Sequence, residues 1–277
     1  MATRGAPLAA ESALITGAAA GIGRATALRL AHEGVRSLVL VDIDEAALAA
    51  AAELVQSAGA RASTHVVDVA DRAAMEALAE AVRAAIGVPD IVVNNAGIGV
   101  AGPFLDTPAD VLDRLVGVNL WGVVHGCRLF GAMLRDRELG GHIVNVASAA
   151  AFAPSTILPA YAMTKAAVLM LSECLRGELA PHGIGVSAVC PGIINTGIVR
   201  STTYVEQDSG RADARRSAAI RLYTRRNYGP ERVAAAIVTA IRRNVAVMPV
   251  TPEARLLRAA VRLSPRMTRR LARARPL

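Results

Sequence analysis

Hydrophobic positions along the chain form short apolar runs that alternate with longer segments of helical periodicity. The short runs predict strands at 13–16, 37–41, 63–67, 91–94, 142–147, 185–190 and 245–247. The longer segments predict helices at 21–32, 45–57, 72–86, 107–134, 158–179 and 230–242. Strands that alternate with helices are typical of βαβ units, in which helices cover both faces of a parallel sheet. We therefore predict a single α/β domain over residues 1–250.

The segment 158–179 is apolar on nearly its whole circumference. A helix without a polar face is normally covered on all sides. We expect the sheet to cover one side and a second copy of the chain to cover the other, which predicts a homo-oligomer.

Composition restricts the class of protein. The chain has 277 residues, of which 53 % are hydrophobic, 19 % charged and only 3 % aromatic, so its core must consist of aliphatic side chains. No uninterrupted apolar run is long enough to cross a bilayer, and the first predicted strand begins too early to leave room for a signal peptide. Cys127, Cys174 and Cys190 lie in apolar segments at unrelated spacings. We expect them to be reduced core residues of a cytoplasmic protein, with no metal bound.

Positive charge is concentrated at the C-terminus. Of the net charge of +8, residues 251–277 carry +7, because they hold eight arginines and one acid, Glu253. The remaining 250 residues therefore carry only +1, which argues against a nucleic-acid-binding body.

The C-terminal segment, 251–277, has the pattern of a basic amphipathic helical extension. Its arginines recur at three- and four-residue steps, and Ser264-Pro265 is expected to end one helix and begin a second. Basic amphipathic helices favour anionic membrane surfaces. Three interpretations stay open: peripheral membrane contact, a cover for a subunit or substrate pocket, and an extension without a function.

A glycine-rich segment, Thr16-Gly17-Ala18-Ala19-Ala20-Gly21-Ile22-Gly23, follows the first predicted strand and opens the first predicted helix. Glycines there allow a tight turn and let the backbone approach a pyrophosphate, which a helix N-terminus attracts. An ordinary glycine-rich turn is the alternative. The position between strand and helix favours a dinucleotide site.

An acid at the end of the second predicted strand supports this interpretation. Asp42 follows Gly23 by 19 residues, where a carboxylate can accept hydrogen bonds from the ribose of adenosine. The same carboxylate would repel a 2′-phosphate, and the nearest basic residue is Arg24. The sequence therefore favours NAD over NADP.

The chain contains one lysine, Lys165, four residues after Tyr161 and hence on the same face of a helix. A tyrosine with a reference pKa of about 10 is a poor base at neutral pH. A positive charge about 4 Å away, at an effective dielectric of about 20, supplies roughly 4 kcal/mol toward ionising it. Ser148 ends a predicted strand 13 residues before Tyr161 and would hydrogen-bond a substrate oxygen. These residues predict a proton-transfer site; purely structural roles are the alternative.

With these residues in view, the chain resembles the classical short-chain dehydrogenases/reductases (SDRs) over about residues 10–249. The resemblance rests on motifs in a fixed order: Thr16–Gly23, Asp68-Val69, Asn94-Asn95-Ala96-Gly97, Asn119, Ser148, Tyr161, Lys165 and Pro191-Gly192-Ile193-Ile194-Asn195-Thr196. It implies a Rossmann-type, seven-stranded parallel sheet in the order 3-2-1-4-5-6-7, assembled as dimers or tetramers. Ala147, Ala151 and Met163 depart from common family residues without removing a reacting group.

The resemblance also implies roles for individual residues. Tyr161 would be the general acid/base, Ser148 would polarise the substrate oxygen, and Lys165 would lower the tyrosine pKa and bind the nicotinamide ribose. Asn119 would kink its helix and hold a proton-relay water. The implied cofactor contacts are Thr16, Gly17, Gly21, Ile22, Gly23, Asp42, Asp68, Val69, Asn95, Ala96, Gly97, Tyr161, Lys165, Pro191, Gly192, Ile194 and Thr196. Among these, Asp68 and Val69 would contact adenine, Asn95 the adenosine-side ribose, and Ile194 and Thr196 the carboxamide.

Loops after the middle strands would line the substrate site with apolar side chains: Val100, Phe104, Phe152, Ala153, Pro154, Ile157 and Leu158. They predict a lipophilic secondary alcohol or ketone of steroid, terpenoid or acyl-chain type, although the same residues could pack the core. The segment 197–228, with seven arginines and three acids, is expected to form a lid. Its arginines are either solvated or face an anionic group of the substrate.

The leading functional hypothesis is an NAD-dependent oxidoreductase acting on a CH–OH group of a small molecule. The alternatives are a cofactor-binding scaffold or sensor without catalysis, and an isomerase, dehydratase or epimerase on the same framework.

Overall fold

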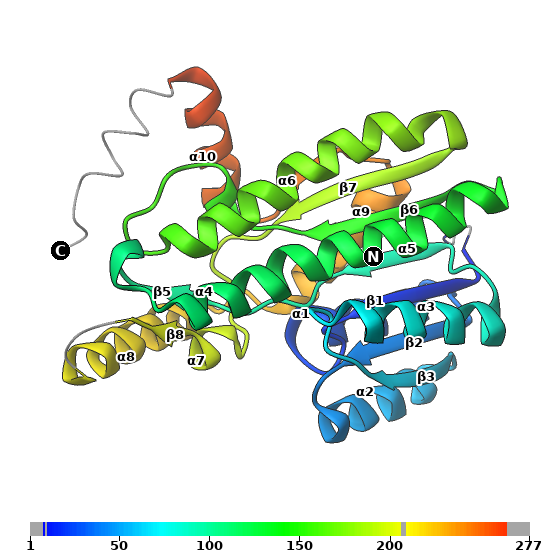
Figure 1. The fold of residues 1–277 in the computed structure, drawn as a ribbon, viewed down its shortest axis with the longest axis horizontal. Helices are drawn as coiled ribbons and strands as arrows, with labels where there is room; N and C mark the ends of the chain where they lie inside the picture. The colour runs from blue at the N-terminus through cyan, green and yellow to red at the C-terminus, as the bar shows by residue number, and fades with distance from the viewer. Residues whose placement is uncertain (1–7, 9, 206–208, 265–277) are drawn as a thin grey trace, which may run out of the picture.

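In the computed structural model, residues 8, 10–205 and 209–264 are described. Seven parallel strands form a central sheet (Figure 1). In spatial order these are β3 (Arg61–Val66), β2 (Ser37–Asp42), β1 (Ser12–Thr16), β4 (Ile91–Asn94), β6 (Gly141–Val146), β7 (Ile184–Cys190) and β9 (Val247–Pro249). The predicted Rossmann-type domain and its 3-2-1-4-5-6-7 order are confirmed, because β5 and β8 lie outside this sheet.

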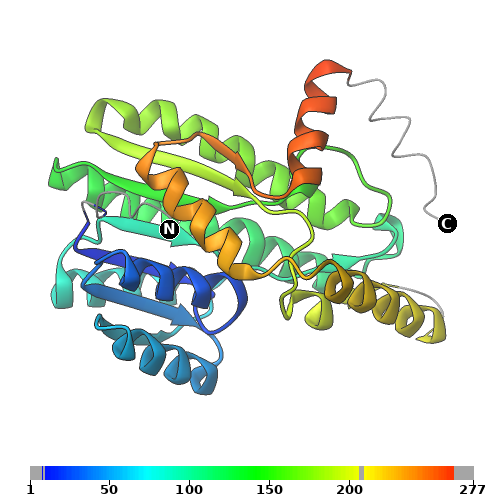
Figure 2. The same ribbon diagram turned by 180° about the vertical axis from the view of Figure 1, so that it is seen from behind.

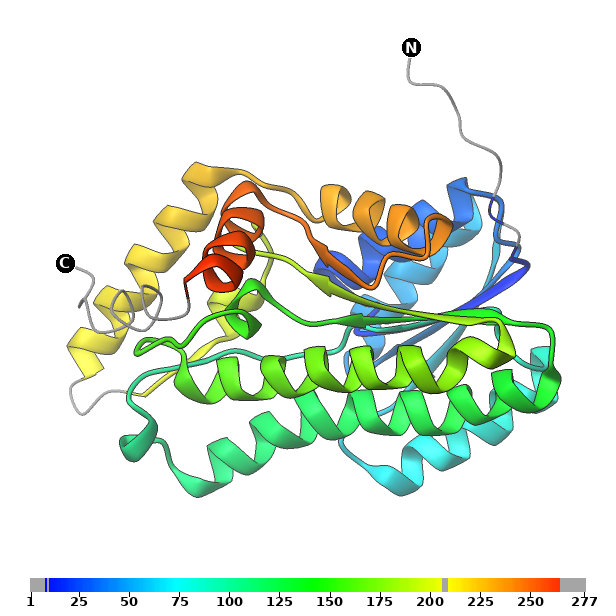
Figure 3. The same cartoon turned by 90° about the horizontal axis from the view of Figure 1, so that it is seen from above.

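Helices cover both faces of the sheet, as Figure 3 shows from above. On one face pack α1 (Gly21–His32), α2 (Glu45–Ser57) and α9 (Pro230–Arg242), and α1 and α9 lie side by side (Figure 2). On the other face pack α3 (Arg72–Ile86), α5 (Gly122–Arg137) and α6 (Pro159–Leu179). The central strands are buried on both sides, which explains their continuous apolar runs. As predicted, the core is largely aliphatic, with Phe130 among its few buried aromatic side chains.

The predicted helix 107–134 is one long irregular helix. It consists of α4 (Ala109–Val116), a π-helical turn (Gly117–Trp121) and α5. Among the described residues, Ala109–Arg137 is the one helix with the length and apolar composition to cross a membrane. Core helices of soluble proteins pass the same test, and here α5 packs on the sheet.

The helix α6 leaves part of its apolar surface open in the single chain. Met163 is 45 % exposed and Met170 is 62 % exposed, whereas Val168 is fully buried. The expected second copy of the chain over this surface stays a prediction.

Several elements from residue 100 onward were not predicted. A separate two-stranded sheet joins β5 (Val100–Ala101) to β8 (Thr203–Tyr204). The predicted lid contains α7 (Ile198–Ser201), β8 and α8 (Ser209–Arg226). Short 3-10 turns lie at η1 (Phe104–Asp106), η3 (Ala149–Ala151) and η4 (Ala180–His182).

The C-terminal segment begins as predicted with a helix, α10 (Pro252–Leu263). The second helix expected after Pro265 lies outside the described residues, and the division into a body and an extension at residue 250 stays a prediction. Cys127 and Cys190 are buried as expected. Cys174 is exposed, so the prediction that all three cysteines lie in the core was wrong: Cys174 lies on the open face of α6.

Candidate active site

The glycine-rich turn connects the carboxyl end of β1 to α1, at the edge of the sheet where open α/β folds bind ligands. Gly17 has φ of +66°, and a Cβ there would lie 2.8 Å from Asn95 Nδ2. A Cβ on Gly23 would lie 1.9 Å from the Gly17 carbonyl oxygen. No side chain caps the N-terminus of α1, so its backbone N–H groups are available to an anion.

The loop after β4 holds this turn in place. Thr16 Oγ1 accepts hydrogen bonds from the backbone N–H groups of Asn95 (3.0 Å) and Ala96 (3.1 Å). Asn95 Nδ2 donates to the carbonyl oxygens of Thr16 (2.9 Å) and Gly17 (3.1 Å). The Asn95 amide nitrogen is therefore committed to the turn, and the ribose contact implied by the resemblance stays a prediction.

Asp42, the last residue of β2, also bonds to the turn. Its Oδ2 accepts from Ala19 N at 2.9 Å, and its Oδ1 accepts from Ile43 N at 2.7 Å and Asp44 N at 3.3 Å. An ionised carboxylate has about four lone-pair positions, so acceptor capacity remains for a ribose hydroxyl. Arg24 is exposed.

Asp68 and Val69 lie after β3, on the side of the site covered by α4 and α5. Asp68 Oδ2 pairs with Arg114 Nη1 at 2.5 Å, and its Oδ1 accepts from Ala70 N at 3.0 Å. Val69 is buried, and a Cβ on Gly122 of α5 would lie 2.6 Å from Val69 Cγ2. The ion pair with Arg114 was not foreseen; it ties the loop after β3 to α4.

Ser148 and Tyr161 meet at the carboxyl end of β6. Ser148 follows β6 and caps η3, where its Oγ accepts from Ala150 N at 3.1 Å. Tyr161 lies in the first turn of α6, which begins at Pro159. The Ser148 side chain lies close enough to the Tyr161 hydroxyl to influence the pKa of that hydroxyl. The structure thus brings together two of the predicted catalytic residues, from two different elements.

Lys165 is buried one turn after Tyr161. It is 3 % exposed, its Nζ donates to the Val146 carbonyl oxygen at 3.0 Å, and this nitrogen lies 5.8 Å from the centre of the Tyr161 ring. Burial lowers the pKa of Lys165 to about 8. Burial also raises the pKa of Tyr161 to about 12, although the nearby Ser148 side chain acts to lower that pKa. In the chain alone, desolvation penalises the charged forms of both side chains. The expectation that Lys165, aided by a nicotinamide cation, lowers the tyrosine pKa stays a prediction.

Asn119 lies in the π-helical turn, so the helix is irregular where the resemblance implied a kink. Its Oδ1 accepts from Ile98 N at 2.8 Å, and its Nδ2 donates to Ile98 O at 3.0 Å and Thr164 Oγ1 at 3.3 Å. A Cβ on Gly97 would lie 3.3 Å from Asn119 Oδ1 and 3.4 Å from Lys165 Nζ. These three residues therefore meet at one point beside the site; the relay water stays a prediction.

The loop after β7 closes the other side. Pro191 O accepts from Ala149 N at 2.7 Å, which links this loop to η3. Thr196 faces the glycine turn, since a Cβ on Gly21 would lie 3.5 Å from Thr196 Cβ. Ile22 and Ile194, also predicted cofactor contacts, pack into the core cluster beneath the site.

Glu253, a residue that sequence reasoning did not assign to the site, holds this loop from α10. Its Oε1 accepts from Ile193 N at 3.2 Å, and a Cβ on Gly192 would lie 2.4 Å from the same oxygen. Its other carboxylate oxygen pairs with Arg226 at the end of α8. The sequence feature that could have indicated this role is that Glu253 is the single acid in the arginine-rich segment 251–277.

The predicted apolar lining divides into two groups. Val100 belongs to a small core cluster with Leu115 and Ala160, against which Tyr161 and Val205 pack, so for Val100 the core interpretation is correct. Phe104 and Ile157 are 44 % and 45 % exposed. The backbone of Ile157 accepts a hydrogen bond from Gly102 N at 2.9 Å, which joins the two loops that carry them.

Two lid tyrosines were missed. Tyr223 of α8 interacts electrostatically with Tyr161 and Tyr204, and burial raises the pKa of Tyr223. The Arg216 guanidinium lies 5.5 Å from the centre of the Tyr204 ring. The sequence feature that could have drawn attention to them is the scarcity of tyrosine, since the chain has only four. In the structure three of the four, Tyr161, Tyr204 and Tyr223, lie near this site.

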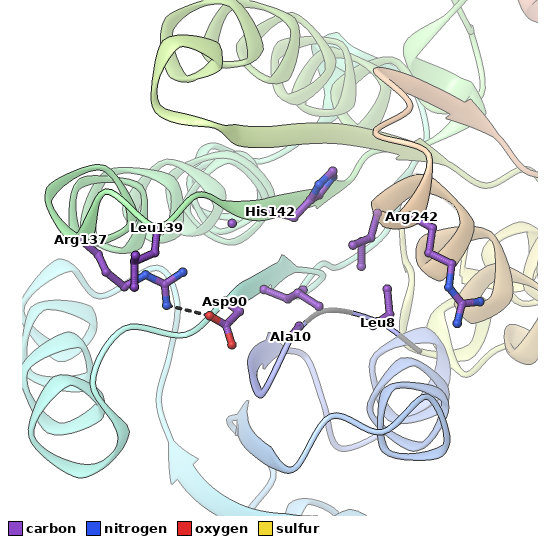
Figure 4. Close-up of a pocket in the computed structure, with 10 residues that line it drawn as sticks. Leu8, Ala10, Asp90, Arg137, Leu139, His142 and Arg242 are labelled. Carbon is purple, nitrogen blue, oxygen red and sulfur yellow. Dashed lines mark hydrogen bonds and ion pairs between the residues drawn. The ribbon is translucent and has the colours of Figure 1, made fainter. Parts of the chain in front are cut away.

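A pocket of about 520 Å³ opens at the opposite edge of the sheet, where β4 and β6 begin (Figure 4). Its charged side chains are already paired, Arg137 with Asp90 and Arg242 with Glu33. Within the described residues, no group of His, Cys, Asp and Glu could hold a metal ion.

Comparison with known proteins places this geometry in a family. The model of the family described as short chain dehydrogenase matches residues 11–207. The chain belongs to the short-chain dehydrogenase family. A solved SDR from Burkholderia phymatum in complex with NAD has a TM-score of 0.85 and 31 % identity, covering 97 % of this chain and 98 % of that one.

Two curated relatives extend the comparison. The Mycobacterium tuberculosis protein named "Probable oxidoreductase EphD" is 49 % identical over 263 residues, which is 94 % of this SDR but 44 % of the relative. This SDR thus spans less than half the length of that relative. The 1-deoxy-11-beta-hydroxypentalenate dehydrogenase of Streptomyces avermitilis is 38 % identical over 192 residues, covering 69 % of this SDR and 71 % of the relative.

Proposed function

We propose that this SDR transfers hydride between NAD(H) and a lipophilic secondary alcohol or ketone, with Tyr161 as general acid/base. The observation that supports this proposal most directly is that side chains from three elements converge beside the glycine-rich turn: Ser148, Tyr161, Lys165 and Asn119. A scaffold without catalysis would not need a buried ammonium next to a phenol, because burying an ammonium is costly.

The turn fits a dinucleotide. Gly17 and Gly23 leave no room for a Cβ against Asn95 and the turn's own backbone, so the turn is tight. The uncapped N-terminus of α1 that follows it would bind the pyrophosphate. The spare acceptor capacity of Asp42 suits a ribose diol, and its charge would repel a 2′-phosphate, which supports NAD over NADP. A bound nicotinamide would supply or accept the hydride.

The proton is handled by the chain's own residues. Ser148 Oγ and the Tyr161 hydroxyl, which lie near each other, would both contact the substrate oxygen. During reduction Tyr161 would donate its proton to that oxygen, and during oxidation it would accept one. Lys165 Nζ has three donors and uses one on Val146 O, so the others remain for the ribose and for stabilising the phenolate.

Several features support a lipophilic substrate and a homo-oligomer. Phe104 and Ile157 present apolar surface on loops near the site, and a relative is a dehydrogenase named for hydroxypentalenate. The open Met163 and Met170 of α6 suit a second copy of the chain, forming a dimer or tetramer. We place the enzyme in the cytoplasm.

The decisive variant is Tyr161→Phe, which removes only the hydroxyl. Turnover of NADH with a panel of lipophilic ketones should fall by about 10²-fold or more. Tyr228→Phe, which removes a hydroxyl bonded to Val250 O away from the reacting pair, is the matched control. Near-normal turnover by Tyr161→Phe would contradict the proposal; substrate conversion without net NADH change would favour an isomerase.

A further inference from the structure

The outward face of α10 combines leucines with arginines. The exposed positions of the helix are 252, 255, 256, 259, 262 and 263, which recur at three- and four-residue steps and so share one face. Leu256 is 73 % exposed and Leu263 is 85 % exposed, and Arg255 and Arg262 are their neighbours on this face. We call these four residues the α10 face.

The orientation of this face is fixed by the inner side of the helix. Thr251 is fully buried and caps α10 by accepting from Ala254 N, and Ala254 is also fully buried. Arg258 Nη1 donates to Val247 O of β9 at 2.8 Å, and Glu253 bonds to the loop after β7. The helix is therefore anchored through one side, and Leu256 and Leu263 lie on the opposite, exposed side. Arg255 is exposed as well, and its Nε donates to Pro249 O at 3.3 Å.

Other exposed apolar side chains lie on segments at the same end of the molecule. Leu105 of η1 is 94 % exposed, Ile157 lies on the loop before α6, and Leu222 of the arginine-rich helix α8 is 51 % exposed. Figures 1 and 3 place α8, α10 and the loop before α6 at one end of the sheet. Ser148 follows the carboxyl end of β6 and caps η3. The helix α10 also contacts η3, directly after Ser148. Exposed apolar side chains and the basic helices α8 and α10 thus lie at one end of the molecule, where α10 contacts the candidate active site through η3.

We propose that the α10 face docks on an anionic lipid bilayer, with Leu256 and Leu263 inserted at the interface and Arg255 and Arg262 bound to headgroup phosphates. Residues 251–277 carry +7 of the net charge, and from residue 264 onward the sequence adds five arginines and no acid. Two copies of the chain meeting at this face would place arginine against arginine, whereas anionic headgroups complement it. The mouth of the site would then lie at the membrane, where a lipophilic molecule dissolves.

The test uses the full chain and sucrose-loaded phosphatidylcholine vesicles with or without phosphatidylglycerol. The pelleted fraction should rise at least fivefold with phosphatidylglycerol and fall with added salt. The double variant Leu256→Asp, Leu263→Asp should lose this gain. Its matched control is Leu54→Asp, Leu139→Asp, which changes two exposed leucines on α2 and before β6 and should pellet like the parent.

The charge contribution is tested separately. Arg255→Gln, Arg262→Gln should lower vesicle binding more than Arg83→Gln, Arg243→Gln, which removes the same charge from α3 and the end of α9. Formation of NADH from NAD and a water-soluble alcohol should stay unchanged in all four double variants, so a failed enzyme assignment is distinguishable from a failed docking surface.

Three outcomes would overturn the proposal. The first is that the Leu256→Asp, Leu263→Asp variant pellets as well as the parent, and the second is that the parent binds neutral and anionic vesicles equally. The third is that this variant changes its oligomeric state in the absence of lipid. The last would show that the α10 face is a subunit interface.

Discussion

Tyr161 and Lys165 show how a reactive pair is held at a cost to the fold. Burial raises the pKa of Tyr161 to about 12 and lowers that of Lys165 to about 8, so both side chains are disfavoured in the ionised forms that proton transfer needs. Groups shifted by burial and placed next to each other are typical of functional sites. The ordinary helical spacing of Tyr161 and Lys165 could be predicted from the sequence, but the competition between burial and charge could not, because it depends on the surrounding fold.

Lys165→Met should abolish turnover and stabilise the fold at neutral pH. A drop from the ordinary pKa of 10.5 to about 8 corresponds to about 3 kcal/mol of burial cost for the ammonium. Below pH 8 the wild-type chain carries this cost in full. As pH rises from 8 to 10.5 the unfolded chain holds the proton that the folded chain has lost, so wild-type stability rises and the advantage of the variant disappears.

The measurement is thermal unfolding of both proteins from pH 7 to 10.5. A melting-temperature difference that is positive at pH 7 and shrinks toward pH 10.5 is expected. Parallel curves across that range would show that burial of Lys165 is not costly.

Asp42 is the residue to which we attribute the proposed preference for NAD over NADP. Asp42→Asn keeps an acceptor for Ala19 N but removes the charge that repels a 2′-phosphate. The ratio of NADPH to NADH affinity, measured by fluorescence titration, should rise by about tenfold. Asp44→Asn, which leaves a good N-cap on α2, should not change that ratio; an unaltered ratio in Asp42→Asn would rule out the charge argument.

At the scale of elements, the glycine turn and α1 form one close-packed unit. The sequence pattern predicted this turn because strand, glycines and helix follow one another directly. It did not predict that Asn95, in a loop 79 residues further along the chain, would hydrogen-bond to Thr16 and hold the turn, nor the pairing of β5 with β8. Such contacts join residues distant in the chain, and a local hydrophobic pattern contains no information on them.

Gly23→Ala should disrupt this unit. The added Cβ would lie 1.9 Å from the Gly17 carbonyl oxygen, a backbone atom that cannot move alone. We expect a loss of about 1–3 kcal/mol in the free energy of unfolding and weaker NADH binding. Gly177→Ala in α6, where a Cβ meets nothing within 4 Å, should instead be neutral or stabilise by up to about 1 kcal/mol. Urea denaturation of both variants gives the comparison, and equal midpoints would contradict it.

At the scale of the whole molecule, α10 joins segments that lie far apart in the chain. Glu253 connects the loop after β7 to the end of α8, so the candidate lid, the cofactor-side loop and the C-terminal helix share one carboxylate. From the sequence we predicted a lid and a basic extension as two separate features. The contact between α8 and α10 could not be predicted, because it forms only after β9 joins the sheet and directs the chain into α10.

Glu253→Gln should loosen all three segments together. The neutral amide keeps an acceptor for Ile193 N but weakens the pairing with Arg226. We expect the KM for the substrate to rise about threefold to tenfold with little change in folding, and trypsin to cleave within 197–226 faster. Glu76→Gln, which breaks an exposed ion pair with Arg72, is the control. An unchanged KM and cleavage rate would separate α10 from the lid.

The single buried lysine also determines how this protein responds to covalent labelling. Amine-reactive reagents find one ε-amino group in the whole chain, 3 % exposed and hydrogen-bonded to a carbonyl. Coupling through lysine would therefore either fail or modify the reacting centre. Because Lys165 is the single lysine and is buried, its rate of acylation depends on how often the structure around it opens. Measuring that rate on the peptide that contains residue 165 would report this opening without any engineered probe.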